Sequence, residues 1–205
     1  MISVLTPTGA RPEAFNRCQE QMLEQDYTGQ VLWVVIDDGP KPQKVWFRKP
    51  HWFTFVVYPE PRWEPGQNTH ARNILAGLDH CADRVVMIED DDQYDPSWIT
   101  RCNGWLDSHD LVGEGGAVYE NVNSGKKIEF NNSEHASMCS TAVKGPAVEW
   151  LRRAARGGDR FIDMRLWRYG RNHHLDRCKI YPNDGGVYGL KGGPGRPGIG
   201  SGHDI

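Results

Sequence analysis

The chain has 205 residues, of which 38% are hydrophobic and 10% aromatic, which suits one sizeable core and so predicts a single domain. Its formal net charge of -3 and sequence pI of about 6.2 give no global reason for attraction to nucleic acid or to anionic membranes. The sequence contains neither a secretory leader pattern nor an apolar run near the ~20 residues of a spanning helix, so we expect a cytoplasmic protein with no membrane span.

Short apolar runs alternate with amphipathic stretches over the first hundred residues. This alternation is typical of βαβ units around a largely parallel sheet. The helical segments place their apolar side chains at intervals of three and four residues. The predicted strands cover residues 2–5, 31–36, 54–58 and 85–88, and the predicted helices cover residues 12–25 and 68–81.

The second half of the chain has a less regular pattern. It predicts a short helix after Pro96, a hairpin over residues 117–130 that turns at residues 123–125, and a helix over residues 147–155. From Gly189 onward Gly and Pro dominate, so we expect a lid or tail without regular structure. The five cysteines are scattered and form no C-x-x-C pair, which indicates reduced structural thiols.

Acidic side chains follow two of the predicted strands. Asp37 and Asp38 follow the second strand, and four consecutive acids, Glu89 to Asp92, follow the fourth. The carboxyl ends of parallel strands are where ligands bind in open α/β sheets. Four adjacent carboxylates repel one another unless a cation or hydrogen-bond donors offset the charge, and hard oxygen ligands suit Mg²⁺ or Mn²⁺ with a nucleotide diphosphate. The alternative interpretation is a solvated acidic turn or a helix cap.

Four motifs in the first hundred residues resemble the family 2 glycosyltransferases. They are Thr6-Pro7-Thr8 after the first strand, Asp37-Asp38 after the second, Ala71-Arg72-Asn73 opening a helix, and the run EDDDQYDP. The resemblance implies a GT-A-type α/β fold: a Rossmann-like, mostly parallel central sheet flanked by helices, with a small mixed sheet on the acceptor side. It also implies inverting transfer of a sugar from a nucleotide-sugar, usually a UDP-sugar. Residues 1–100 would form the donor half, 101–190 the acceptor half and 191–205 the lid or tail.

The resemblance also assigns donor-side residues. Thr6, Asp38 and Arg72 would bind the nucleotide, and Asp90 would contact its ribose. Asp91 would bind Mn²⁺ or Mg²⁺, with Glu89 and Asp92 as alternates because the extra acids leave the register open by one residue. A surface ion pair is the other interpretation of Arg72.

Inverting transfer needs a base that removes the proton from the acceptor hydroxyl. The segment GGDRFIDMRLWRYG resembles the stretch of the family that carries this base, which makes Asp163 the candidate and Asp159 the reserve. Ile162 stands where the family usually has Glu, and either aspartate could instead cap the helix.

The segment GIGSGHD places His203 after several glycines. By the same resemblance His203 is a second metal ligand, the alternative being an idle residue in a tail. Four other histidines show no comparable pattern and are interpreted as surface or core residues: His70, His135, His173 and His174. Some tryptophans could stack on a sugar or a base, although core packing explains most of them: Trp63, Trp98, Trp150 and Trp167.

Other functions remain open at this stage. A nucleotidyltransferase also holds a metal-nucleotide with carboxylates at strand ends, and a non-catalytic module could bind a nucleotide or a divalent cation. The acceptor could be a glycan or a hydroxymethylated base of phage DNA. Nucleic acid would need a basic channel, for which the arginines between residues 152 and 171 are a conceivable source, although such a cluster is more often a solvated helix face.

Overall fold

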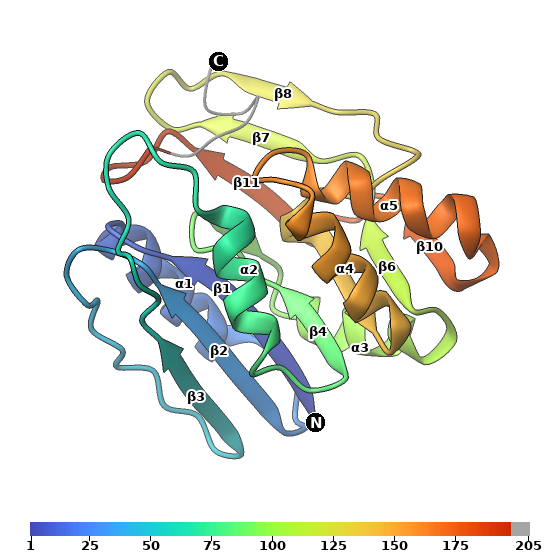
Figure 1. Cartoon of the computed structure of the whole chain (residues 1–205), viewed down its shortest axis with the longest axis horizontal. Coiled ribbons are helices and arrows are strands. Elements are labelled where there is room, and N and C mark those ends of the chain that lie inside the picture. Colours follow the sequence, from blue (N-terminus) through green and yellow to red (C-terminus); the bar gives the residue numbers. More distant parts are fainter. Residues whose placement is uncertain (198–205) are drawn as a thin grey trace.

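The computed structural model describes residues 1–197, and its centre is a seven-stranded sheet in the order β10-β6-β9-β4-β1-β2-β3 (Figure 1). Strands β4, β1, β2 and β3 pair in parallel with one another, whereas β9 runs antiparallel to both β4 and β6. The strands are β1 (Ile2–Thr8), β2 (Val31–Asp37), β3 (Trp52–Val57), β4 (Arg84–Met87), β6 (Leu111–Glu114), β9 (Thr141–Lys144) and β10 (Cys178–Tyr181).

A second, four-stranded sheet has the order β5-β11-β7-β8 and mixes parallel and antiparallel pairs. Its strands are β5 (Asp92–Tyr94), β7 (Val118–Asn121), β8 (Lys127–Glu129) and β11 (Val187–Lys191). Strand β5 begins within the acidic run, so the chain passes from the central sheet through the carboxylates into the second sheet. The acidic run therefore lies at the junction of the two sheets.

Helices cover both faces of the central sheet. One apolar cluster joins α1 and α3 to β1 and β2, and a second joins α2, α4 and α5 to the other face of the same strands. In Figure 1, α2, α4 and α5 lie in front of the sheet. The helices are α1 (Pro12–Glu24), α2 (His70–Leu78), α3 (Trp98–Ser108), α4 (Pro146–Arg156) and α5 (Ile162–His173), with 3-10 turns at Met138–Ser140 and Leu175–Arg177.

The sequence predictions for the first hundred residues are confirmed, with boundaries shifted by a few residues. Strand β1 is longer than predicted, because Thr6 to Thr8 continue its ladder with β2. The predicted hairpin is β7 and β8, and the helix predicted over residues 147–155 is α4. The five cysteines are free thiols.

One expectation about the Gly-rich terminus is wrong. Residues 189–191, expected to lack regular structure, complete β11, whose backbone pairs with β5 and β7. Gly189 fits this position because a Cβ there would lie 1.9 Å from the Tyr119 ring. The neighbouring strands supply the hydrogen bonds that the local sequence does not predict. Within residues 1–197, no helix has the length and apolar character needed to cross a membrane.

Two glycines in helices offer a matched test of this packing. Gly77 faces the sheet, where a Cβ would lie 2.2 Å from Leu5 Cδ1, whereas a Cβ on Gly104 of α3 would meet nothing within 4 Å. Gly77→Ala should therefore destabilise the protein by about 1–3 kcal/mol through overpacking. Gly104→Ala should stabilise it by about 0.5–1 kcal/mol through helix propensity. Urea unfolding of both variants measures the difference, and equal stabilisation would contradict the close approach of α2 to β1.

Candidate active site

Three loops meet at the carboxyl edge of the central sheet. The ladder between β1 and β2 sets Thr8 opposite Asp37, and β4 is the other neighbour of β1. The loop after β1, the Asp37-Asp38 turn and the acidic run after β4 therefore lie side by side. Gly9 permits this approach, because a Cβ there would lie 2.3 Å from Asp38 Oδ1. This is the edge at which ligands bind in open α/β sheets.

Arg11 is the first cation that holds the acidic run. Its guanidinium lies 2.9 Å from Asp90 Oδ1 and 2.7 Å from Asp91 Oδ2. Thr8 Oγ1 donates a 2.6 Å hydrogen bond to Asp90 Oδ2. Burial raises the pKa of Asp90 to about 6, although the Arg11 charge acts in the opposite direction. Asp90 is thus a buried residue that ties the β1 loop to the β4 loop.

Lys191, at the end of β11, is the second cation. Its ammonium donates a hydrogen bond to Asp92 Oδ1 and lies 3.6 Å from Asp91 Oδ1. Burial acts to lower the pKa of Lys191, but Asp91, Asp92 and Glu89 outweigh it and raise that pKa well above its ordinary value. Lys191 therefore stays charged at neutral pH.

The cluster remains short of positive charge. Among the described residues, four carboxylates (Glu89 to Asp92) stand against the two cations Arg11 and Lys191, which leaves two negative charges when all four acids are ionised. His70 Nε2 lies 3.4 Å from Glu89 Oε1, but burial lowers the pKa of His70 to about 4, so it is neutral at pH 7. Burial raises the pKa of Glu89 and of Asp92 to about 7. The site therefore favours further positive charge, which protons or a bound cation can supply.

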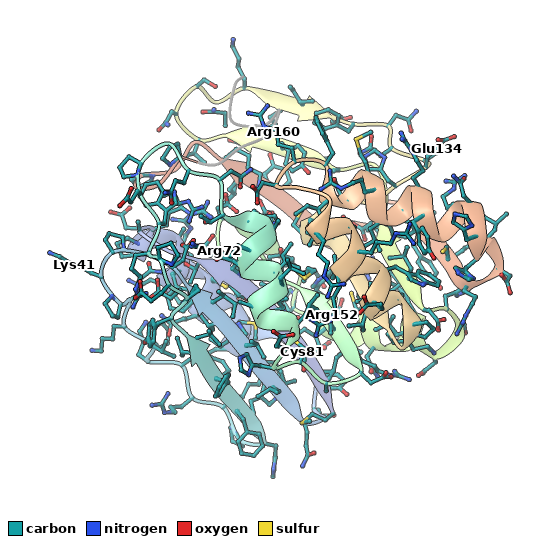
Figure 2. The ribbon with its side chains drawn as sticks, in the orientation of Figure 1. Lys41, Arg72, Cys81, Glu134, Arg152 and Arg160 are labelled. Carbon is teal, nitrogen blue, oxygen red and sulfur yellow. The ribbon has the colours of Figure 1, made fainter. Side chains whose placement is uncertain are left out.

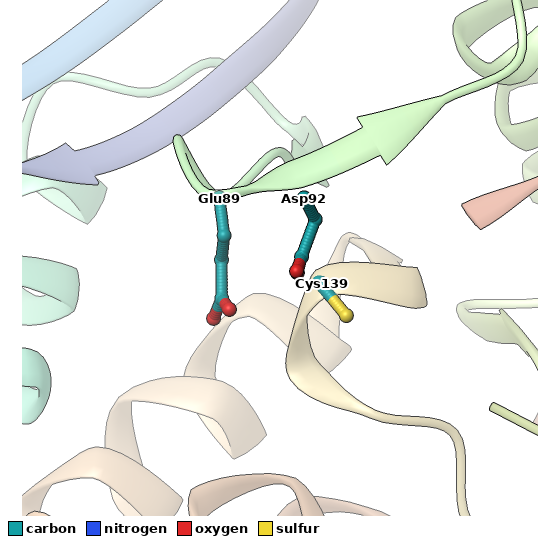
Figure 3. A group of neighbouring side chains, drawn as sticks. All are labelled: Glu89, Asp92 and Cys139. Atoms are coloured by element: carbon teal, nitrogen blue, oxygen red, sulfur yellow. The ribbon is translucent and has the colours of Figure 1, made fainter. Parts of the chain in front are cut away.

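The donor atoms suit a hard divalent cation only in part. Ligand atoms of Glu89, Asp92 and Cys139 lie within 4.8 Å of one another, and Figure 3 shows the two carboxylates pointing the same way from the chain after β4. Burial raises the pKa of the Cys139 thiol well above its ordinary value, so it stays protonated and is a poor ligand for Mg²⁺ or Mn²⁺. Glu89 and Asp91, which line the adjacent pocket, are the carboxylates best placed for such an ion.

The pocket has a volume of about 610 Å³. Its donor side is formed by the β1 loop and the acidic run, including Thr8, Arg11, Glu89 and Asp91. The opposite side is formed by the segment that opens α5 and by the chain that follows the β7–β8 hairpin. The lining residues there include Asp159 to Met164, Tyr119, Phe130, Asn132 and His135. Arg160 is one of these lining residues and is labelled in Figure 2, above α4.

Asp38 is buried beside the pocket and is bound by three side chains, two from the start of α2 and one from the chain after β11. Arg72 NH2 lies 3.2 Å from its Oδ2, and Thr69 Oγ1 donates to the same oxygen. Arg196 NH1 donates to Asp38 Oδ1 at 2.8 Å, and the Arg196 guanidinium lies 4.8 Å from the Trp63 ring centroid. Arg196 also lines the pocket, so the chain after β11 closes this end of it.

The sequence-predicted site residues fall into three groups. Asp91, Asp159 and Asp163 line the pocket. Thr6, Asp38, Arg72 and Asp90 lie behind the lining of the described residues: Thr6 Oγ1 accepts a hydrogen bond from Trp33 Nε1 in the core, and it is Thr8 that reaches the pocket. His203 lies outside the described residues.

Sequence reasoning missed the cations Arg11, Lys191 and Arg196, and it set aside His70, which lines the pocket. A signal for Lys191 was present. Alternate residues of β11 are buried, so Lys191 shares the buried face with Val187. A lysine on that face needs a carboxylate partner. No local pattern links Arg11 or Arg196 to particular acids, because those partners are distant in sequence.

Comparison with known proteins supports the fold. No family model matches the chain, and no curated protein matches it. Among solved structures, Staphylococcus aureus TarS 1-349 in complex with UDP has a TM-score of 0.63 at 12% identity, covering 92% of this chain and 60% of that one. The complex of TarS 1-349 with UDP-GlcNAc gives a TM-score of 0.61 at 14% identity, covering 93% of this chain and 58% of that one. The chain thus spans about 60% of these structures, and the likeness confirms the expected fold class.

The Lys191 contacts predict a measurable coupling. Lys191→Met would leave buried carboxylates without their counter-charge and should destabilise the protein by about 3–5 kcal/mol. Adding Asp92→Asn should recover part of that loss, because it removes one of the uncompensated charges. Chemical unfolding of the two single variants and the double variant gives the coupling energy. Lys126→Met, at an exposed position of the hairpin, is the control and should change stability by less than about 0.5 kcal/mol. Additive effects of Lys191→Met and Asp92→Asn would contradict this ion pair.

Proposed function

We propose that the chain is a metal-dependent inverting glycosyltransferase that moves a sugar from a nucleotide-sugar, a UDP-sugar, to a hydroxyl acceptor. The observation that carries this proposal is the buried cluster of four carboxylates held by two cations, set at the edge of a pocket of about 610 Å³. The fold supports it, because structures of similar fold were solved with UDP and with UDP-GlcNAc.

The donor would bind between the β1 loop and the acidic run. The nucleobase would reach the end of the pocket near Asp38, where Arg72 and Arg196 converge and Arg196 covers the Trp63 ring. Both oxygens of Asp38 are already bound, so direct contact with the nucleotide requires Arg196 to move. The diphosphate would then lie near Arg11, whose positive charge offsets phosphate charge.

The divalent cation, Mn²⁺ or Mg²⁺, would be held by Asp91 with Glu89 as the second carboxylate, and its positive charge would stabilise the leaving diphosphate. Binding of the ion would displace the protons that Glu89 and Asp92 hold near neutral pH. Asp90 and Asp92 lie behind the pocket lining and are bound to Arg11 and Lys191, so they would set the position of the site. Asp91 lines the pocket and is itself paired with Arg11, so it would bind the ion and the guanidinium together or exchange one for the other.

The acceptor would enter from the side of Asp159 and Asp163, which line the pocket opposite the acidic run. In the proposed step, Asp163 accepts the proton of the acceptor hydroxyl, with Asp159 as the reserve base. The acceptor oxygen forms a bond to the anomeric carbon, and the bond from that carbon to the diphosphate oxygen breaks. UDP leaves from the opposite face, so the configuration inverts, and Arg11 and Lys191 stabilise its charge.

Calorimetric titration of UDP with and without Mn²⁺ tests the donor site. We expect Mn²⁺-dependent binding that Asp91→Asn weakens by at least about tenfold, because the variant removes a metal-binding charge. Asp107→Asn is the matched control, since Asp107 is exposed and pairs with Arg84 far from the pocket. Circular dichroism shows whether each variant is folded. Absence of UDP binding by the wild type under both conditions would contradict the proposed function.

Hydrolysis and transfer assays separate the base from donor binding. Asp163→Asn should lower kcat for transfer by about 10²–10⁴-fold, because it removes the group that takes the proton, while leaving UDP affinity unchanged. Asp159→Asn should have the smaller effect. The reverse order would reassign the base to Asp159. Unchanged turnover in the double variant, in which neither carboxylate remains, would exclude both as the base.

A further inference from the structure

Phe161 has a backbone and an environment that packing does not explain. Its side chain is 64% exposed, and it lines the pocket. Its φ of 57° and ψ of 37° place it in the left-handed region, directly before α5. An aromatic residue rarely adopts this conformation, which persists only where the surrounding structure enforces it. The next residue, Ile162, is 3% exposed and supplies the core contact, so the Phe161 ring is not needed for packing.

Arg165 enforces the conformation of the segment that carries Phe161. Its Nε donates to the carbonyl of Ala154 at 2.9 Å, and its guanidinium also donates to the carbonyls of Gly158 and Arg160. The Arg165 backbone N–H donates to the Phe161 carbonyl at 3.0 Å. A single side chain thus binds both ends of the turn between α4 and α5, and the ring is held outward over the pocket.

A second anchor joins this turn to the donor side. Asn68 Nδ2, from the loop before α2, donates to the Asp159 carbonyl at 3.0 Å. Asn68 and Asp159 both line the pocket, so the rim is continuous from the α2 loop to Phe161. The backbone that carries Phe161 is therefore held in place relative to the candidate bases.

The rest of this side of the pocket combines aromatic and neutral polar groups. Tyr119 and Phe130 pack edge to face with their ring centroids 5.5 Å apart. Asn132 and His135 lie beside them in the lining. Together with Phe161 these residues offer flat apolar faces next to hydrogen-bonding groups, which is how proteins bind rings that carry hydroxyl groups.

We propose that Phe161 is the stacking platform of an acceptor subsite, and that this subsite binds the ring of a neutral saccharide. The proposal rests on the proposed glycosyltransferase function and names its acceptor class. The charges at the rim favour a neutral ligand: Asp159 and Asp163 outnumber Arg160. Carboxylates accept hydrogen bonds from sugar hydroxyls but repel phosphates, so a nucleic acid acceptor would meet net negative charge here.

At least four of the seven arginines between residues 152 and 171 have structural partners. Arg152 pairs with Asp79, Arg156 pairs with Glu149, and the Arg153 guanidinium lies over the Tyr169 ring. Arg165 binds backbone carbonyls as described above. These contacts stabilise α4, α5 and the turn between them. They offset the charge of these arginines, which favours a saccharide over a nucleic acid as the ligand.

Two soluble probes test the subsite: methyl β-D-glucopyranoside and N,N′-diacetylchitobiose. Saturation-transfer NMR measures their binding to the whole chain, with and without UDP and Mn²⁺. Phe161→Ala should weaken binding by about tenfold, because it removes the ring face. Phe161→Trp should restore binding, since it retains an aromatic face. Phe53→Ala, which removes a ring 60% exposed on β3, is the matched control and should bind as the wild type does.

Phe161→Asn separates a functional ring from a structural one. Asn adopts the left-handed conformation more readily than Phe, so the variant should raise Tm by about 2 °C. It should nevertheless bind the probes as weakly as Phe161→Ala. Loss of binding together with a gain in stability is expected only if the ring is retained for the ligand. A fall in Tm with unchanged probe binding would overturn the proposal.

Two results with the glycoside probes would overturn the role of Phe161. One is equal binding by the wild type and Phe161→Ala, and the other is the absence of probe binding by the wild type. Stronger binding of a single-stranded oligonucleotide than of either glycoside overturns the saccharide class. UDP titration is scored separately: if UDP fails to bind while the glycosides bind through Phe161, the proposed transferase function fails and the saccharide subsite stands.

Discussion

Two cationic side chains distant in sequence, Arg11 and Lys191, hold the acidic run that follows β4. Arg11 belongs to the loop between β1 and α1, whereas Lys191 ends a strand of the second sheet. Burying a carboxylate without a partner is costly, so the run is stable only where both segments are in place. The ion pairs therefore link the two sheets and both ends of the described chain. They fix the pocket edge on which Glu89 and Asp91 lie.

The same charges explain why this edge suits a phosphorylated donor. The two cations position the cluster but do not neutralise it, so a divalent cation has a favourable place beside them. Arg196 extends this arrangement to the far end of the pocket by binding Asp38. Donor recognition would thus depend on the chain after β11 as well as on the acidic run. On the opposite side, Arg165 holds Phe161 over the pocket, so both walls are shaped by arginine contacts.

Local pattern was enough to predict the first half of the fold and the acidic edge, because each strand or helix there has its own periodicity. Strands β6, β9, β10 and β11 escaped prediction because they are formed by pairing with strands distant in the sequence, in segments without a clear alternation of their own. The aspartates at the carboxyl edge of the sheet could be predicted from their place after buried strands. Arg11 and Lys191 could not, since the acids that bind them lie about 80 and 100 residues away in the chain. Phe161 gave no sequence signal, because its left-handed backbone is imposed by Arg165.

A divalent cation would offset the remaining negative charge of the carboxylate cluster. A crystal structure of the complex with UDP and Mn²⁺ tests this most directly. The account predicts an anomalous peak for manganese in contact with the Asp91 carboxylate and the diphosphate oxygens, with Lys191 still bound to Asp92. A complex in which UDP is held by Arg11 and Lys191 alone, with no manganese peak at the carboxylates, would contradict it.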